Sequence, residues 1–421
     1  MIHPETIRAD FPVFAHHPSL VYLDSAATSL KPRVVIDKER EYLEEYPANI
    51  SRGLYELSNR ATREYEETRK AVAEWIGALR TEVVFTKGTT EALNLLSYTL
   101  ESILAKGDSI VVTGMDHHAN FLPWQALALR TGAQFRVIPV SESGEISEEA
   151  LQSHVDKTTK IFAFPFVSNV LGSISPVAKI ATAVRALAPE ARIILDAAQA
   201  APHMPLDTAT LGVDFLALSA HKCFGPTGVG VLWGKEDILQ SLPPFQYGGD
   251  MVESARIEGS LFKETPYRFE AGTPNISGVI AFHAAIDSMR SLDMEEIRKY
   301  EHALTKYAVE TLQDNIPHIR ILGPHQQENR SGIISFVLHD IHPHDLAESL
   351  AAEDVCIRAG AHCAHPLHAL LNIPASARIS LSVYNTQSDI DRAIESIQKA
   401  QHAYRSHHES TPFTSSRLAK D

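Results

Sequence analysis

Residues 214–222 have the sequence DFLALSAHK, an apolar run of strand type that ends in small, hydrogen-bonding residues and a lysine. A second apolar run, residues 191–195 with the sequence ARIIL, ends at an acidic side chain, Asp196. Around these segments, from about residue 80, short β-rich runs alternate with longer helical ones. Such alternation is typical of a parallel sheet with helices on both faces. Because ligands of these sheets bind beyond the carboxyl ends of the strands, we expect Lys222 and Asp196 to share a site.

The pattern of the chain changes after about residue 280. A long helical stretch over residues 279–313 leads to a strand-like run at 333–337 and then to further helix and strand, which suits a smaller α+β domain. We therefore predict an α/β fold with a large domain at 21–284, a small domain made of 1–20 and 285–408, and a flexible tail at 409–421, where Ser and Thr abound without an apolar period. In the large domain, strands are predicted at 83–86, 110–113, 135–138, 161–164 and 214–218, with helices at 93–103, 120–130 and 177–187.

Composition restricts the class of protein. The 421 residues are 44% hydrophobic and 21% charged, as in an ordinary globular protein. The net charge of −14 argues against nucleic acid or an anionic membrane as the main partner, since both require a basic face. No run is long and apolar enough for a membrane span, and the first residues lack the features of a signal peptide. Three scattered cysteines do not form a disulfide framework, so we expect a cytoplasmic protein.

Three groups that pyridoxal phosphate requires are present. Lys222 offers an amine for the aldehyde, Asp196 offers a carboxylate for the ring nitrogen, and residues 88–90 (GTT) open a helix whose free N–H groups suit a phosphate. Each has an ordinary explanation as well: a surface lysine, an aspartate that starts a turn, and a helix N-cap. The position of Lys222 directly after an apolar strand, between His221 and Cys223, favours the cofactor.

Eight short motifs strengthen this prediction as a set. They are YLDSAA at 22–27, GTTE at 88–91, DHHAN at 116–120, VSNVLG at 167–172, DAAQA at 196–200, HK at 221–222, FEAGTPN at 269–275 and RAGAHCA at 358–364. With them the chain resembles the SUF-type (group II) cysteine desulfurases of the class V aminotransferase superfamily, over roughly residues 10 to 405. The resemblance implies the α/β fold of fold-type I pyridoxal phosphate enzymes: a large domain with a mostly parallel, seven-stranded sheet covered by helices, and a smaller α+β domain.

The resemblance also assigns cofactor contacts. It implies that Lys222 forms the imine and moves the proton at the substrate Cα, while Asp196 keeps the ring nitrogen protonated. By the same resemblance His117 stacks on the ring and takes part in proton transfer, although a histidine there could also be a core residue bonded to backbone. The remaining contacts that it implies are Gln199 with the phenolic oxygen, Thr89, Thr90, Ser219 and His221 with the phosphate, and Thr273 with the phosphate of the other subunit, which implies a homodimer.

At the substrate end the resemblance implies that Arg378, Asn169 and Ala26 bind L-cysteine. Cys363 then attacks the substrate sulfur, which gives a persulfide on the enzyme and releases alanine. Cys363 lies in a polar segment without apolar period, unlike Cys223 and Cys356, which we expect to be small buried side chains. Its neighbours Arg358 and His362 are predicted to favour the thiolate.

The histidines of residues 339–368 also suggest a zinc site. The absence of a second cysteine pair argues against one, and we predict no resident metal. The run HPHD at 342–345 resembles that of family members that pass sulfur to a zinc-containing acceptor, so the resemblance implies that His344 contacts such a partner. Three positions depart from the family pattern: Ser51 and Ala361 stand where histidine is usual, and Ala220 where glycine is usual.

The leading hypothesis is a pyridoxal phosphate-dependent cysteine desulfurase, a sulfurtransferase that supplies sulfur for iron–sulfur cluster assembly or for another sulfur-transfer route. An alternative is a selenocysteine lyase, or another superfamily enzyme acting on a β-substituted amino acid. A third class, a metal-binding scaffold without catalysis, conflicts with the presence of both Lys222 and Asp196. We expect L-cysteine and a SUF-type sulfur acceptor as partners, with no nucleic acid and no membrane.

Overall fold

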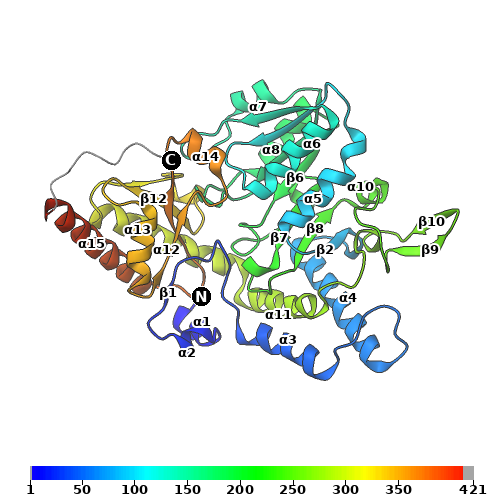
Figure 1. Cartoon of the computed structure of the whole chain (residues 1–421), viewed down its shortest axis with the longest axis horizontal. Coiled ribbons are helices and arrows are strands. Elements are labelled where there is room, and N and C mark those ends of the chain that lie inside the picture. The colour runs from blue at the N-terminus through cyan, green and yellow to red at the C-terminus, as the bar shows by residue number, and fades with distance from the viewer. Residues whose placement is uncertain (1, 411–421) are drawn as a thin grey trace.

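The structure, a computed structural model, describes residues 2–410 and contains a seven-stranded central sheet (Figure 1). Its strands follow the order β2-β8-β7-β6-β5-β3-β4. The run from β7 to β4 is parallel, and β8 is antiparallel to both of its neighbours. The mostly parallel sheet is therefore confirmed. The strands are β2 (Val83–Thr86), β3 (Ser109–Thr113), β4 (Gln134–Ile138), β5 (Thr159–Pro165), β6 (Arg192–Asp196), β7 (Phe215–Ser219) and β8 (Gly230–Gly234).

Helices cover both faces of this sheet because successive strand side chains point to opposite sides. On β3, Val112 packs in one hydrophobic core with α5 and α6, whereas Val111 packs in the other core with α4, α8 and α11. The helices of this part are α3 (Arg33–Glu45), α4 (Glu56–Ile76), α5 (Thr89–Thr99), α6 (Leu122–Thr131), α7 (Glu148–His154), α8 (Val177–Leu187), α9 (Thr208–Leu211), α10 (Glu236–Ser241) and α11 (Ile276–Leu292). The strands β9 (Val252–Arg256) and β10 (Gly259–Phe262) form a hairpin that projects from the body (Figure 1).

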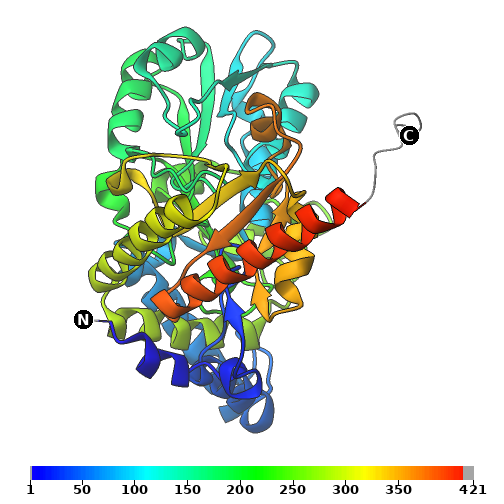
Figure 2. The same ribbon diagram turned by 90° about the vertical axis from the view of Figure 1, so that its left-hand side faces the viewer.

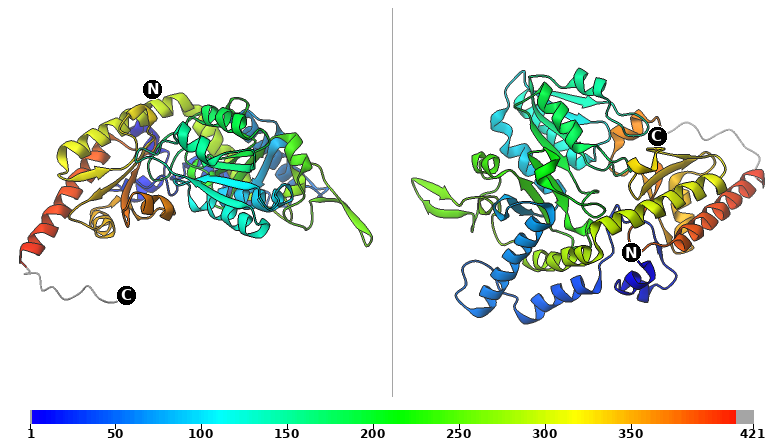
Figure 3. Two further views of the ribbon diagram at one scale, coloured as in Figure 1. Left: turned by 90° about the horizontal axis from the view of Figure 1, so that it is seen from above. Right: turned by 180° about the vertical axis from the view of Figure 1, so that it is seen from behind.

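A second, antiparallel sheet has its own core and lies as a separate lobe beside the first (Figure 3). Its order is β11-β12-β15-β14, and α12 and α15 lie side by side along it (Figure 2). Its elements are β11 (Ile319–Ile321), β12 (Ile333–Leu338), β14 (Arg358–Gly360), β15 (Ser376–Ser380), α12 (Met294–Asn315), α13 (Pro343–Ala351), α14 (His365–Leu370) and α15 (Gln387–Ser410). Near the N-terminus lie α1 (Pro4–Ala9), α2 (Val13–His16) and β1 (Val21–Tyr22), of which β1 pairs in parallel with β13 (Val355–Cys356).

The long helix predicted over 279–313 is two helices. The chain turns at Asp293, which has φ 64°, and its carboxylate accepts a hydrogen bond from Glu295 N at 2.9 Å. An aspartate in this position caps the following helix, although the apolar spacing alone runs on through it. The first two residues of the predicted tail, 409 and 410, close α15, and residues 411–421 lie outside the described residues.

None of the helices in the described range 2–410 combines the length and the apolar character that crossing a bilayer requires.

Candidate active site

A cavity of about 300 Å³ opens beyond the carboxyl ends of the parallel strands, between the two lobes. Nearly all of the side chains singled out in the sequence line it, and their individual roles remain predictions. Thr273 is exposed and does not line the cavity, and neither do Ser51 and Ala361, the two positions where histidine is usual in the family. The predicted site residues in the wall are Ala26, Thr89, Thr90, His117, Asn169, Asp196, Gln199, Ser219, His221, Lys222, Cys363 and Arg378.

Lys222 and Asp196 come from neighbouring strands. Asp196 is the last residue of β6, and Lys222 closes the short 3₁₀ turn that follows β7. Burial lowers the pKa of Lys222, which makes the neutral, nucleophilic amine easier to form. The Asp196 carboxylate accepts a hydrogen bond from Ala198 N at 2.9 Å through Oδ1, while Oδ2 receives no hydrogen bond from residues 2–410. One carboxylate oxygen is thus available to a bound group.

His117 and Gln199 form a second pair, which could flank a flat ring. His117 Nδ1 accepts a hydrogen bond from Ala119 N at 3.0 Å, which assigns the proton of the neutral imidazole to Nε2. Burial, and then the positive charge of Lys222, lower the His117 pKa to about 3, so the ring is neutral near pH 7. Gln199 donates to Ala26 O at 2.8 Å, and its Oε1 is buried without a partner. Such an orphaned acceptor fits a cavity that receives a polar ligand.

The end of the cavity formed by Thr89 and Ser219 suits a phosphate. The backbone N of Thr89, at the start of α5, donates to Ser219 Oγ at 2.8 Å, and the two hydroxyls lie 2.8 Å apart. This arrangement gathers hydroxyl groups at the positive end of a helix. The strand β8 approaches closely, because a Cβ on Gly230 would lie 2.3 Å from Gly88 Cα. The site residues present therefore fit pyridoxal phosphate: an amine, a free carboxylate oxygen, an orphaned acceptor and a phosphate-type helix start.

Arg378 provides a buried cation at the substrate end. Its Nη1 donates to Asn169 O at 3.0 Å, its Nη2 donates to Asp24 Oδ1 at 3.3 Å, and its Nε has no partner. Asp24 also pairs with Arg358 Nη2 at 2.8 Å. Burial lowers the pKa of Arg378 to about 10, which still leaves it charged at pH 7. A free donor on a charged group suits a carboxylate. Asp24 was not singled out in the sequence, because its two partners lie more than 300 residues away.

Cys363 lies on a strained loop in the cavity wall. Both His362 and Cys363 have positive φ values, 50° and 55°, which are uncommon for residues other than glycine. Two hydrogen bonds hold the loop: His118 N donates to Cys363 O at 2.8 Å, and Asn169 Nδ2 donates to His362 O at 2.7 Å. The side chain of Cys363 is exposed, as a reactive thiol must be.

The prediction that His362 favours the thiolate by its charge is wrong. The ring is buried against Ser376, and burial followed by the charge of Arg378 lowers its pKa to about 3. The imidazole is therefore neutral at pH 7. Arg358 remains as a nearby cation, and part of its charge is balanced by Asp24.

The other cysteines differ from Cys363: Cys223 is buried as predicted, whereas the prediction that Cys356 is buried is wrong, because it is only partly covered. Burial raises the pKa of Cys223 to about 12 and also raises that of the half-buried Cys356. Both are thiols at neutral pH.

The histidines form local pairs. Over the described residues 2–410, no group of three or more His, Cys, Asp or Glu side chains is arranged to hold a metal ion. The rings of His118 and His365 stack at 5.0 Å, and His362 and His368 both contact Ser376. His344 is exposed, and its Nε2 lies 3.6 Å from the point that a Cβ on Gly360 would occupy.

Comparison with known proteins gives one family. The family model described as aminotransferase class-V matches residues 21–393. The probable cysteine desulfurase of Streptomyces coelicolor is 42% identical over 94% of this chain and 97% of its own length. The solved apo structure of a cysteine desulfurase from Thermococcus onnurineus has a TM-score of 0.91 at 36% identity, with 96% of this chain and 99% of that chain covered.

A second solved structure agrees with the first. The cysteine desulfurase CsdA of Escherichia coli, in an S-sulfonic acid form, has a TM-score of 0.89 at 32% identity and covers 96% of this chain and 99% of its own. These matches confirm the predicted α/β fold of the fold-type I enzymes. The chain belongs to the class V aminotransferase family, and cysteine desulfurases are among its relatives.

Proposed function

We propose that this protein is a pyridoxal phosphate-dependent cysteine desulfurase that converts L-cysteine to L-alanine and keeps the sulfur on Cys363. One observation carries the proposal: an exposed thiol on a strained loop lines the same cavity as Lys222, Asp196 and Arg378. A lyase without sulfur transfer needs the amine, the acid and the arginine, but it does not need that thiol. The cysteine desulfurase relatives support the same activity.

The chain's own residues provide binding and proton transfer. Bound pyridoxal phosphate supplies an aldehyde for the substrate amine and an electron sink for bond breaking at Cα. Arg378 binds the substrate carboxylate, and Asp196 holds a proton on the ring nitrogen. Lys222, whose pKa burial lowers, takes the proton from Cα, and His117 lines the cavity wall with it as the second group assigned to proton transfer.

Cys363 carries out the sulfur transfer. Its thiolate attacks the substrate sulfur, a sulfur–sulfur bond forms, and the Cβ–sulfur bond breaks with its electron pair left on carbon. A proton then adds to that carbon, so alanine leaves and Cys363 holds a persulfide. The carbon gains the electrons that the two sulfurs lose, so no external oxidant is required.

We further infer a SUF-type (group II) enzyme that is cytoplasmic and homodimeric and that passes sulfur to an acceptor for iron–sulfur cluster assembly or another route. Three free cysteines support the reducing compartment. Exposed Thr273 supports the dimer, because the resemblance assigns it to the partner's phosphate. The acceptor would contact exposed His344, which lies beside Gly360 at the base of the Cys363 loop.

The test gives the purified holoenzyme L-cysteine and measures alanine together with protein-bound persulfide, in equal amounts after a single turnover. Lys222→Ala should lose the imine absorbance and both products. Alanine without a persulfide on Cys363 would contradict the sulfur-transfer step. Turnover of selenocysteine with almost none of cysteine would replace the proposal with a selenocysteine lyase.

A further inference from the structure

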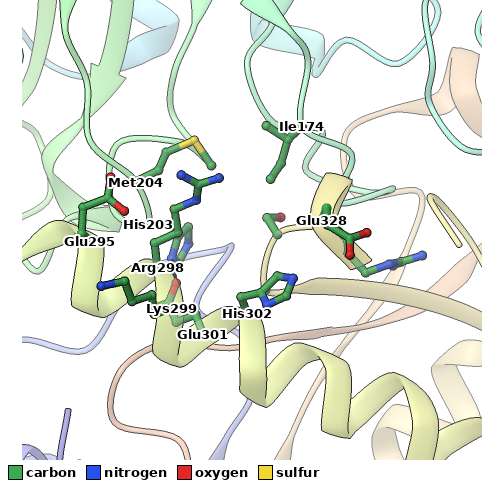
Figure 4. Close-up of a pocket in the computed structure, with 12 residues that line it drawn as sticks. Ile174, His203, Met204, Glu295, Arg298, Lys299, Glu301, His302 and Glu328 are labelled. Atoms are coloured by element: carbon green, nitrogen blue, oxygen red, sulfur yellow. Dashed lines mark hydrogen bonds and ion pairs between the residues drawn. The ribbon is translucent and has the colours of Figure 1, made fainter. Parts of the chain in front are cut away.

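A second cavity, of about 340 Å³, lies between α12 and the loops that follow β5 and β6 (Figure 4). It shares no lining residue with the active-site cavity. In Figure 4, Glu295 and Arg298 of α12 point toward Ile174 and Met204, which come from the larger lobe. The volume falls in the range of sites for small metabolites.

Two buried polar atoms in its wall have no partner. Glu301 is 3% exposed, and its Oε2 lies 2.8 Å from His203 Nδ1, but its Oε1 has no hydrogen-bond partner. Ser331 is 7% exposed, and its Oγ is also without a partner. Buried polar groups are nearly always hydrogen-bonded, so each such atom requires an explanation. Because both residues line the same cavity, one occupant could satisfy both.

The wall also carries a buried cation that no carboxylate neutralises. Arg330 is 3% exposed and donates to main-chain carbonyls, those of Leu322, Pro324 and Ile333. Over residues 2–410 it forms no ion pair. The exposed Arg298 adds a second positive charge at the cavity. The cavity thus presents a carboxylate oxygen that needs a donor, and hydroxyl and guanidinium groups that suit an acceptor.

We propose that this cavity is a binding site for a small amino-acid zwitterion. The ammonium group donates to Glu301 Oε1, and the carboxylate accepts from Ser331 Oγ and is attracted by Arg330 and Arg298. A simple anion would leave Glu301 Oε1 unsatisfied beside it, and a simple cation would leave Ser331 Oγ and the Arg330 guanidinium without an acceptor.

The cavity is connected to the active site through two loops. Ser331 N donates to Gly172 O at 2.8 Å, and Ile174 N donates to Asn329 O at 2.9 Å, so two hydrogen bonds join the same two loops. The same turn carries Asn169, which holds both Arg378 and the Cys363 loop. A ligand that orders this turn therefore changes cysteine binding, and this regulatory part of the inference rests on the proposed function. Thermodynamic linkage requires cysteine to change the affinity of the second site by the same factor.

The test uses N,N-dimethylglycine as the probe, because its tertiary amine cannot form an imine with an aldehyde. Calorimetric titration of the holoenzyme should show one saturable site per chain. Ser331→Ala and Glu301→Gln should each weaken binding about tenfold, equivalent to about 1.4 kcal/mol. Glu295→Gln is the matched control, since Glu295 lines the same cavity but is exposed, and binding to it should equal that of the wild type.

Three results would overturn the proposal. The first is no saturable binding of the probe, which leaves ordered water as the occupant. The others are a probe affinity of Ser331→Ala equal to that of the wild type, and an affinity for acetate equal to that for the probe, which makes the site a plain anion site. Ser331→Ala keeps the test valid if Glu301→Gln fails to fold. The binding result does not depend on desulfurase activity, so the two proposals can fail separately. The regulatory part predicts a shift in the KM for cysteine with saturating probe in the wild type and no shift in Ser331→Ala.

Discussion

Among single residues, the strongest prediction concerns Cys363. Cys363→Ala should retain the cofactor, because Lys222 and Asp196 are unchanged, but it should make alanine from cysteine at least about a hundredfold more slowly, a loss typical of a missing nucleophile. Cys223→Ala and Cys356→Ala should keep most of the activity, because burial holds both as thiols. The measurement is the initial rate of alanine release. A near-normal rate in Cys363→Ala would exclude this thiol as the sulfur acceptor.

The buried histidines predict how stability depends on pH. His117 and His362 have a folded pKa of about 3, below the ordinary value of 6.5, so the unfolded chain binds more protons between these values. The free energy of unfolding that depends on these two neutral rings is fully present above pH 6.5. It is lost as the pH falls toward 3, by at most about 1.4 kcal/mol per pH unit for each group.

His362→Gln provides the check on that slope. The free energy of unfolding in urea, measured at several pH values between 7 and 5, should fall less steeply for the variant than for the wild type. Acidic groups titrate alike in both proteins, so the difference isolates one histidine. Parallel slopes would mean that His362 binds protons equally in the folded and unfolded states, so that its pKa is not lowered by folding.

At the level of elements, the phosphate end of the site depends on how closely β8 approaches the start of α5. A Cβ on Gly230 would lie 2.3 Å from Gly88 Cα, a contact that only a backbone shift can relieve. Gly230→Ala should therefore raise the Kd for pyridoxal phosphate by about tenfold or more and lower the melting temperature. Gly249→Ala is the control, since nothing lies within 4 Å of its Cβ position. Equal cofactor affinity in the two variants would show that the turn adapts.

Much of the fold and the candidate site was predictable because the relevant signals are local. Strand ends such as Asp196 and Ser219, and the helix start at Thr89, each follow from a few neighbouring residues. Asp24 could not be found this way, because its role depends on the register of β14 against β15, where Arg358 lies opposite Arg378. The break at Asp293 was hidden by a continuous apolar pattern, and we propose it as the boundary between the lobes in place of residue 284.

The second cavity illustrates the same limit more strongly. His203, Glu301 and Ser331 come from three segments with no shared motif, and only the packing of α12 against the larger lobe brings them together. Sequence patterns report burial and secondary structure, whereas an orphaned oxygen is a property of the packed whole.

For the whole molecule, we predict that Thr273 of one chain contributes to the active site of its partner chain. Thr273 is exposed and absent from the cavity of its own chain, although Gly272 and Pro274 on either side line a small cavity near the exposed Ser51. This position is consistent with a residue that serves the neighbouring subunit. Thr273→Ala should therefore weaken cofactor binding, because a hydrogen bond to a charged phosphate contributes about 1.5–3 kcal/mol.

Mixed dimers distinguish contact within the chain from contact across the interface. We expect Lys222→Ala chains to be inactive and Thr273→Ala chains to be impaired at limiting pyridoxal phosphate. In a heterodimer of the two, the site that keeps Lys222 faces the intact Thr273 of the other chain, so about half of the wild-type activity per dimer should return with wild-type cofactor affinity. If Thr273 acted within its own chain, that site would lack the hydroxyl, and the heterodimer would keep the weak cofactor binding of the Thr273→Ala parent. Light scattering on the same samples checks the dimer itself, and a fully active monomer at low concentration would contradict the shared site altogether.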